Sequence, residues 1–192
     1  MGITAEKYFE NLYSAIFSPK AFFKREDLSI SIRLAITTIT LVTVFTKCTI
    51  ATFEGTLGTG SFYASLISGI LSTIFLWFIT GLFFEYTAKI YGNDGNLTKI
   101  LFFTSFAPVP YIFYAPLNLL KNVGSLGYVL GTYSEIFLYF WIIFLYALAI
   151  NATYKISIAR SFMLIFLPFI ASFFAFYWVI CFFSKLWYIL SI

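Results

Sequence analysis

The sequence contains no histidine and only two cysteines, and these shortages exclude several kinds of site. Without histidine the chain cannot build a histidine-ligated zinc site, a Ser-His-Asp triad or an imidazole proton relay. Cys48 and Cys181 each lie inside an apolar run, and no CxxC pair occurs, so we interpret both as small apolar packing residues. Gly-x-Ser-x-Gly motifs and glycine-rich phosphate loops are missing as well, so we expect no enzymatic activity, no cofactor and no metal.

Charged residues are also scarce. They make up 10% of the 192 residues, whereas a soluble domain typically has about 25%. Hydrophobic residues reach 61%, and the mean hydropathy is +0.92. A domain of this length cannot bury so much apolar surface in its own core, so its solvent must include lipid. The net charge of +4 is spread over short loops instead of one face, so we expect no nucleic-acid partner.

The first 28 residues contain an apolar stripe with helical spacing. Its members are Tyr8, Phe9, Leu12, Tyr13, Ile16 and Phe17, and Glu6, Lys7, Glu10 and Asn11 lie on the opposite side. The Ser18-Pro19 step ends this helix and starts a shorter one. We therefore predict that residues 1–28 form a cytoplasmic amphipathic leader. Two compatible placements stay open, which are the membrane surface and the inner face of the protein itself.

Five apolar runs follow the leader, at about residues 29–53, 61–91, 97–121, 132–154 and 161–190. Each reaches the roughly 20 residues that an α-helix needs to cross a bilayer. The sequence therefore predicts an all-α fold, a polytopic membrane helical bundle with five transmembrane helices behind an N-terminal amphipathic helix. Residues 29–192 form its membrane domain, with a glycine-rich outer loop at 122–131.

The third span is predicted to be broken by Pro108, Pro110 and Pro116. A proline inside a helix removes a backbone donor and clashes with the preceding turn. An unsatisfied backbone group in lipid costs several kcal/mol, so neighbouring helices or water must shield the break. We therefore expect this span at the centre of the bundle.

Basic residues are distributed unevenly between the two sets of loops. With the amino end inside, the inner segments hold Lys7, Lys20, Lys24, Arg25, Lys89, Lys99, Lys155 and Arg160. The outer segments hold Lys121 and Lys185. The positive-inside rule therefore places the amino end in the cytoplasm and the carboxyl end outside or in a lumen. In a prokaryote the protein would reside in the cell inner membrane.

Charged residues within and beside the spans are the candidate site residues. Arg33 and Glu85 are predicted one or two helical turns deep at the inner side, as an ion pair between neighbouring helices. A proton- or ion-coupled site at Glu85 is the alternative, because a carboxylate in a membrane is a default site hypothesis. Lys47 is predicted near the outer face, within reach of Glu54 or of Glu135 on the fourth span.

Several short motifs occur in a characteristic order along the chain. They are Leu-Tyr-Ser-Ala-Ile-Phe-Ser-Pro at 12–19, Tyr-Gly-Asn-Asp-Gly-Asn-Leu-Thr-Lys at 91–99, Ala-Pro at 107–108, Trp141, and Tyr-Lys-Ile-Ser-Ile-Ala-Arg at 154–160. With these motifs the chain resembles the Yip family of membrane proteins, the Rab-interacting group with large prokaryotic branches. The resemblance implies a five-span bundle with a cytoplasmic amino end and no known enzymatic activity.

Eukaryotic members of that family are associated with Rab GTPases and vesicle traffic through a longer cytoplasmic amino region. This chain lacks their Asp-Leu-Tyr-Gly-Pro motif, so it resembles a prokaryotic-type member and Rab binding is not carried over.

Functional hypotheses from different classes follow. The first is a non-enzymatic integral membrane protein of the Yip type, acting in membrane organisation or trafficking-type interactions through protein or lipid contacts. The second is a permease or channel for a small solute or ion, in which the proline-broken third span lines a cavity. An accessory subunit of a membrane complex is the third. The lipid bilayer is the partner expected in each case, and other membrane proteins or a second copy of the chain stay open.

Overall fold

The computed structural model describes residues 5–25, 28, 30–90, 92 and 95–190, and every regular element in these residues is a helix. In chain order the elements are α1 (Ala5–Phe17), α2 (Pro19–Lys24), α3 (Ile32–Phe53), α4 (Gly60–Ile90), α5 (Leu97–Phe106), the 3-10 helix η1 (Val109–Phe113), α6 (Tyr114–Leu120), α7 (Gly124–Tyr154) and α8 (Ile158–Leu190). The all-helical fold is therefore confirmed for the described residues.

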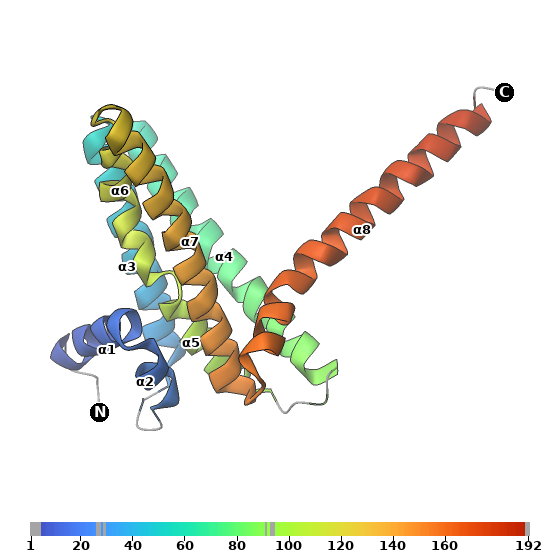
Figure 1. Ribbon diagram of the computed structural model, residues 1–192, viewed down its shortest axis with the longest axis horizontal. Coiled ribbons are helices and arrows are strands. Elements are labelled where there is room, and N and C mark those ends of the chain that lie inside the picture. The colour runs from blue at the N-terminus through green and yellow to red at the C-terminus, as the bar shows by residue number, and fades with distance from the viewer. Residues whose placement is uncertain (1–4, 26–27, 29, 91, 93–94, 191–192) are drawn as a thin grey trace.

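The helices α3, α4, α5, α6 and α7 form one bundle, and α1 and α2 lie against one end of it (Figure 1). We call this end the leader end. The chain also turns there between α4 and α5 and between α7 and α8, whereas the α3–α4 and α6–α7 turns lie at the far end. From the leader end α8 extends away from the other helices, in contact with α7 and to a lesser degree with α4.

Four helical stretches of the described chain are long and apolar enough to cross a membrane. They are Ile32–Phe53, Gly60–Ile90, Leu97–Leu120 and Gly124–Tyr154. Helix α8 contributes two shorter apolar stretches, Ile158–Leu167 and Phe176–Lys185. The helices are those of a multi-pass membrane protein, as the hydropathy predicts, and the fifth span stays a prediction.

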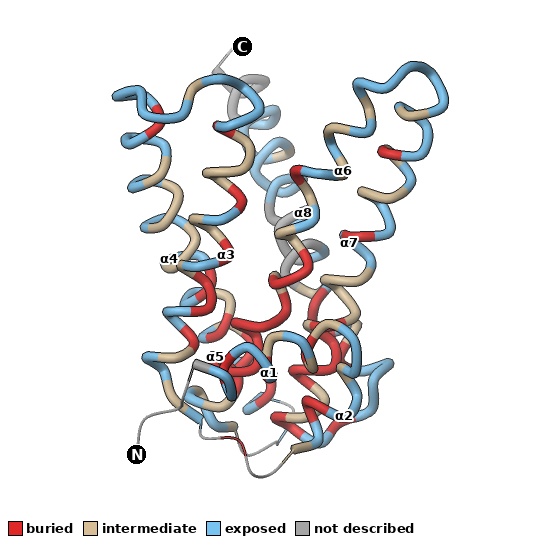
Figure 2. Tube along the Cα trace, turned by 90° about the vertical axis from the view of Figure 1, so that its left-hand side faces the viewer, coloured by how far each residue is buried: buried red, intermediate tan, exposed pale blue. Residues whose placement is uncertain are grey.

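The buried core is concentrated in the half of the bundle near the leader end (Figure 2). Its centre is α5, where Ile100, Leu101, Phe102, Phe103, Thr104, Ser105 and Phe106 are all buried. Helix α5 packs against α3, α4 and α7. The third candidate span is 61% buried, whereas the other three are 11–39% buried. The central position expected for the third span is therefore confirmed.

The α-helix of the third span is interrupted where the prolines cluster. Helix α5 ends at Phe106, and Pro108 is the residue before the 3-10 helix η1, which contains Pro110. Pro116 behaves differently from the prediction, because it lies in the first turn of α6 and interrupts no helix. First-turn backbone donors have no acceptor within the helix, so a proline is tolerated there.

The segment predicted to be an outer loop at 122–131 is mostly helical, because α7 begins at Gly124. A glycine in this segment serves helix packing instead of a turn. A Cβ added at Gly131 would lie 2.7 Å from Cγ of Lys121 and 3.0 Å from the carbonyl oxygen of Leu117. Glycine thus lets α7 approach α6 closely, which sequence spacing alone does not distinguish from a loop.

Candidate functional site

The leader packs one side of α1 against the bundle. Tyr8, Asn11 and Ala15 are buried, and the Tyr8 hydroxyl donates a hydrogen bond of 3.1 Å to Oγ1 of Thr38 on α3. Burial raises the pKa of Tyr8 above its usual value, so its phenol stays neutral and remains a donor. Asn11 departs from the prediction, which put it on the polar side. Its spacing from Tyr8 and Ala15 places it on the packed side of the helix instead.

The opposite edge of the predicted stripe faces outward. Phe9, Tyr13 and Phe17 recur every four residues and are 66%, 63% and 63% exposed. Leu12 and Ile16 pack against the core cluster that contains Ala15, and both are only half-buried. The stripe is therefore divided, because one edge packs on the protein and the other presents a row of aromatic rings.

Helix α2 anchors the leader to the centre of the bundle. Pro19 occupies its first turn, where the missing backbone donor costs nothing. Phe22 and Phe23 are buried, and their ring centroids lie 4.9 Å from that of Phe106 and 5.5 Å from that of Phe103, respectively. Aromatic contacts at such distances stabilise by about 0.5–1.5 kcal/mol beyond simple burial. The leader is thus part of the folded core.

A cavity of about 480 Å³ opens at the leader end, between the α2–α3 connection, α5 and the end of α7. Among the residues that the structure describes, its lining consists of Phe23, Lys24, Arg25, Leu28, Ile30, Lys99, Phe103, Asn151, Ala152 and Lys155. We call this cavity the basic pocket, because four of these residues are basic and none is acidic. It has the size of a typical small-ligand site.

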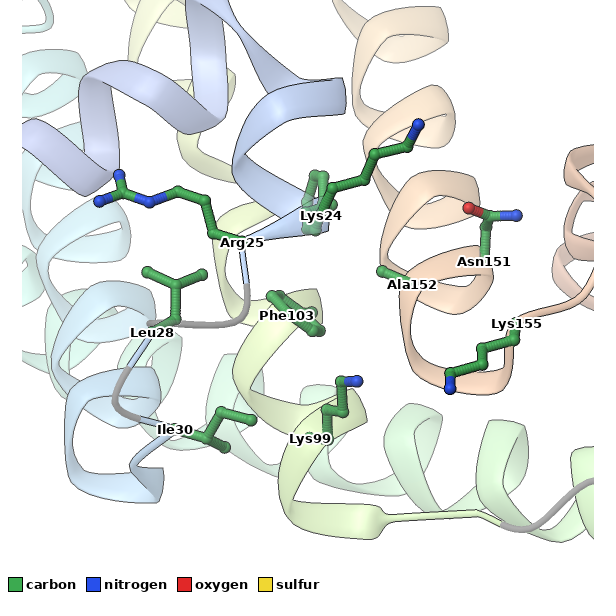
Figure 3. Close-up of a pocket in the computed structure, with 10 residues that line it drawn as sticks. Lys24, Arg25, Leu28, Ile30, Lys99, Phe103, Asn151, Ala152 and Lys155 are labelled. Carbon is green, nitrogen blue, oxygen red and sulfur yellow. The ribbon is translucent and has the colours of Figure 1, made fainter.

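The four basic side chains of the basic pocket point in different directions (Figure 3). Lys99 and Lys155 point their ammonium groups toward each other, whereas Lys24 and Arg25 direct theirs to either side. The Lys99 ammonium also lies 5.8 Å from the ring centroid of Phe103, a cation–π distance. Arg25 has Glu10 of α1 at 3.9 Å.

Glu85 is a second polar feature of the leader end. It is 7% exposed, and its carboxylate accepts a hydrogen bond of 3.0 Å from the Tyr154 hydroxyl and pairs with the Lys89 ammonium at 3.1 Å. Gly95 lies directly against this carboxylate, where a Cβ would collide with it. The Glu85 carboxylate of α4 therefore contacts both α7 and the segment just before α5.

The structure does not bring Arg33 and Glu85 together, within the residues that it describes. Arg33 is exposed in the first turn of α3, while the carboxylate of Glu85 is occupied by partners on α4 and α7. The i, i+4 spacing of Glu85 and Lys89 on one helix was a usable signal for that contact. The sequence contains no comparable signal for the contact between Glu85 and Tyr154, because that contact depends on which helices face each other.

Charges at the far end also take different partners from those predicted. The Lys47 ammonium donates to Oγ of Ser65 on α4 at 3.3 Å, and Glu54 is exposed at the end of α3. Lys47 can lie along α4 because Gly69 has no side chain, and a Cβ there would be 3.1 Å from Cε of Lys47.

Glu135 of α7 is paired with Lys121 instead of Lys47. Its carboxylate accepts a hydrogen bond from the Lys121 ammonium and so raises the pKa of Lys121 above its usual value. This contact joins the α6–α7 turn to the body of α7. No group of three or more Cys, Asp or Glu side chains converges on one point in the part of the chain that the structure describes.

The sequence interpretation did not predict the basic pocket. Lys99 and Lys155 were assigned only to membrane orientation, because inner loops of any multi-pass protein are enriched in basic residues. The short motifs at residues 91–99 and 154–160 carried the only signal, since Lys99 is the last residue of the first and Lys155 the second residue of the other.

Comparison with protein-family models matches the Yip1 domain over residues 13–179. No curated protein and no solved structure gives a significant match. The matched segment begins within α1 and ends within α8, so it includes both the basic pocket and the Glu85 contact. The chain belongs to the Yip1 domain family.

Proposed function

We propose that this Yip1 domain protein is non-enzymatic and acts in membrane organisation or trafficking-type interactions, through contacts made at its leader end. The observation that carries the proposal is the divided apolar stripe of α1. A helix packed on the protein by Tyr8 and Ala15 still presents Phe9, Tyr13 and Phe17 as a row of exposed aromatic rings. Aromatic edges beside basic residues are typical of helices that lie in the membrane interface.

The proposal includes five spans, with the amino end in the cytoplasm and the carboxyl end outside. Helix α8 has 33 residues and is therefore about 50 Å long, more than the roughly 30 Å of a hydrocarbon core. The fold gathers Lys24, Lys99 and Lys155 at the leader end, which supports a cytoplasmic position of that end. Compartment reporters fused to the two ends should be active on opposite sides of the membrane, and activity of both on one side would contradict the topology.

Depth-dependent fluorescence quenching tests the leader contact. A fluorophore is attached to a cysteine at position 13 or 17, in a variant whose native cysteines Cys48 and Cys181 are replaced by serine. We expect strong quenching by lipids that carry a nitroxide near the headgroup. A label at Lys7, which is exposed and lies about a third of a turn around α1 from Tyr13, is the matched control and should be quenched weakly. Equal quenching at all three positions would refute the proposal.

A permease or channel is less well supported. The segment around the proline break is tightly packed, since Phe106, Ala107 and Val109 are nearly inaccessible. The basic pocket lies beside the first turns of α5, and none of its described lining residues belongs to the proline break. Solute flux into vesicles that disappears in Glu85→Gln would reverse this preference.

A further inference from the structure

We propose that the basic pocket binds a phosphate group, supplied by the headgroup of an anionic phospholipid, between Lys99 and Lys155. The inference goes beyond the proposed contact role of α1, because it assigns a defined ligand site in a different part of the leader end. It rests on three observations about the pocket: its charge, its rigidity and its shape.

The described side chains at the centre of the pocket carry two positive charges. Lys99 and Lys155 come from different helices, yet their ammonium groups face each other across the cavity (Figure 3). No carboxylate of the described residues forms an ion pair with either lysine. Two like charges that face each other repel, and because Lys155 is exposed and Lys99 half-buried, water weakens this repulsion without removing it. An anion between them removes this repulsion, and phosphate is an anion that lysine commonly binds.

Both lysines are held by well-defined backbone. Lys99 is in the first turn of α5, where its backbone N–H donates to Oδ1 of the cap residue Asn96 at 3.0 Å. Lys155 ends α7 with its backbone N–H bonded to the carbonyl of Asn151 at 2.8 Å. The Asn151 side chain in turn donates to the carbonyl of Ile156. The backbone of both lysines is therefore fixed before any ligand arrives, so binding has to order only their side-chain torsions.

Lys155 adopts a backbone conformation that lysine normally avoids. Its φ is +55°, and among the described residues it is the one non-glycine residue with positive φ. Helices usually end in this conformation with glycine or asparagine, because a Cβ is unfavourable there. The end of α7 explains the conformation but not the choice of lysine over glycine, and strain of this kind is often found at functional sites.

The shape of the pocket favours a lipid headgroup over a free phosphate ion. A phosphate ion alone would leave most of a volume of about 480 Å³ empty. Phe23, Leu28, Ile30 and Phe103 add an apolar wall that suits a glycerol and the start of acyl chains. Clusters of lysine and arginine beside a span are also typical of sites for anionic lipids.

Binding of a soluble short-chain lipid to the full-length protein tests the proposal. The probes are dihexanoyl phosphatidic acid below its micellar concentration and inorganic phosphate, each titrated onto protein in a maltoside detergent. We expect saturable binding of the lipid and weaker binding of inorganic phosphate to the same site. Equally tight binding of inorganic phosphate would overturn the assignment to a lipid source while the phosphate chemistry would stand.

The double variant Lys99→Gln with Lys155→Gln should bind the lipid about 25-fold more weakly, roughly five-fold per lysine. Lys7→Gln with Lys20→Gln is the matched control, since it removes the same charge from exposed positions outside the pocket. We expect its binding to remain within two-fold of the native protein, as an approximate limit. An equal loss in both double variants, or no lipid binding by the native protein, would overturn the proposal.

Lys155→Gly separates binding from folding. Glycine relieves the positive φ at this position, so the thermal midpoint should be unchanged or higher while lipid binding falls. A binding loss that appears only together with a lower midpoint would mean that Lys155 is merely structural. Quenching of labels at positions 13 and 17 does not depend on either lysine, so failure of the pocket and failure of the proposed leader contact are distinguishable.

Discussion

Replacing Tyr154 by phenylalanine should loosen the attachment of α4 to α7 without changing the shape of the core. The hydroxyl of Tyr154 donates to the Glu85 carboxylate at 3.0 Å, and the two residues are 5% and 7% exposed. Helix α4 packs mainly on α3 and α5, so this bond is a direct connection between two helices that have few close backbone contacts with each other. Phenylalanine keeps the ring and removes only the donor.

The expected cost follows from the chemistry of the bond. A hydrogen bond to a charged group contributes about 1.5–3 kcal/mol net, whereas polar contacts between membrane helices average about 0.6 and reach about 1.7 kcal/mol. Lys89 remains paired with Glu85 in the variant, so the carboxylate is not left alone. We therefore expect Tyr154→Phe to lower the free energy of unfolding by about 1.5 kcal/mol, roughly a ten-fold change in the folding equilibrium.

Reversible unfolding by SDS in mixed micelles measures this change. Tyr86→Phe is the matched control, because it removes a hydroxyl from the residue next to Glu85 that is 68% exposed. It should change stability by less than about 0.5 kcal/mol. In a Glu85→Ala background the effect of Tyr154→Phe should also fall below about 0.5 kcal/mol, since the bond is already absent.

Two results would contradict the reasoning. A loss of similar size in Tyr86→Phe would show that the assay reports tyrosine hydroxyls in general. An undiminished effect of Tyr154→Phe in the Glu85→Ala background would show that the hydroxyl acts through some other group.

Three further predictions concern the packing of the spans. Asn96→Ala should destabilise the protein by about 1 kcal/mol in the same unfolding assay, because the cap of α5 is lost, while Asn96→Asp should not. Thr104→Val should cost about 1 kcal/mol and shift the fluorescence of Trp77, whose Nε1 donates to the Thr104 hydroxyl at 3.2 Å; an unchanged spectrum would contradict this contact. Gly69→Leu should displace Lys47 from α4, so chemical acylation of Lys47 should become faster.

The features that the sequence predicted well are local ones. The Asn96 cap and the proline after Ser18 act within one or two turns, and the structure has helix starts at both places. The long apolar runs predict the candidate spans for the same reason, since each run satisfies its backbone within itself. The segment at 122–131 shows the limit of such rules, because it is mostly helical and its Gly131 serves contact with α6.

The partners of charged side chains were predicted poorly. Depth in the membrane pairs Glu85 with Arg33 and Lys47 with Glu135, and helical spacing offers Glu54 as the other partner of Lys47. Depth determines which charges share a level, but helix rotation and neighbour order determine which of them face each other. Lys47 meets α4 because a glycine makes room for it, and depth contains no information about that contact.

By itself, then, the amino-acid sequence determined an all-helical membrane chain with a broken third span, since hydropathy and backbone chemistry act over short distances. Only the tertiary structure decided which edge of the leader is buried, which residue binds Glu85, and that Lys99 and Lys155 share a pocket. Those facts depend on how helices far apart in the chain are rotated and packed against one another, and spacing along one helix does not specify that arrangement.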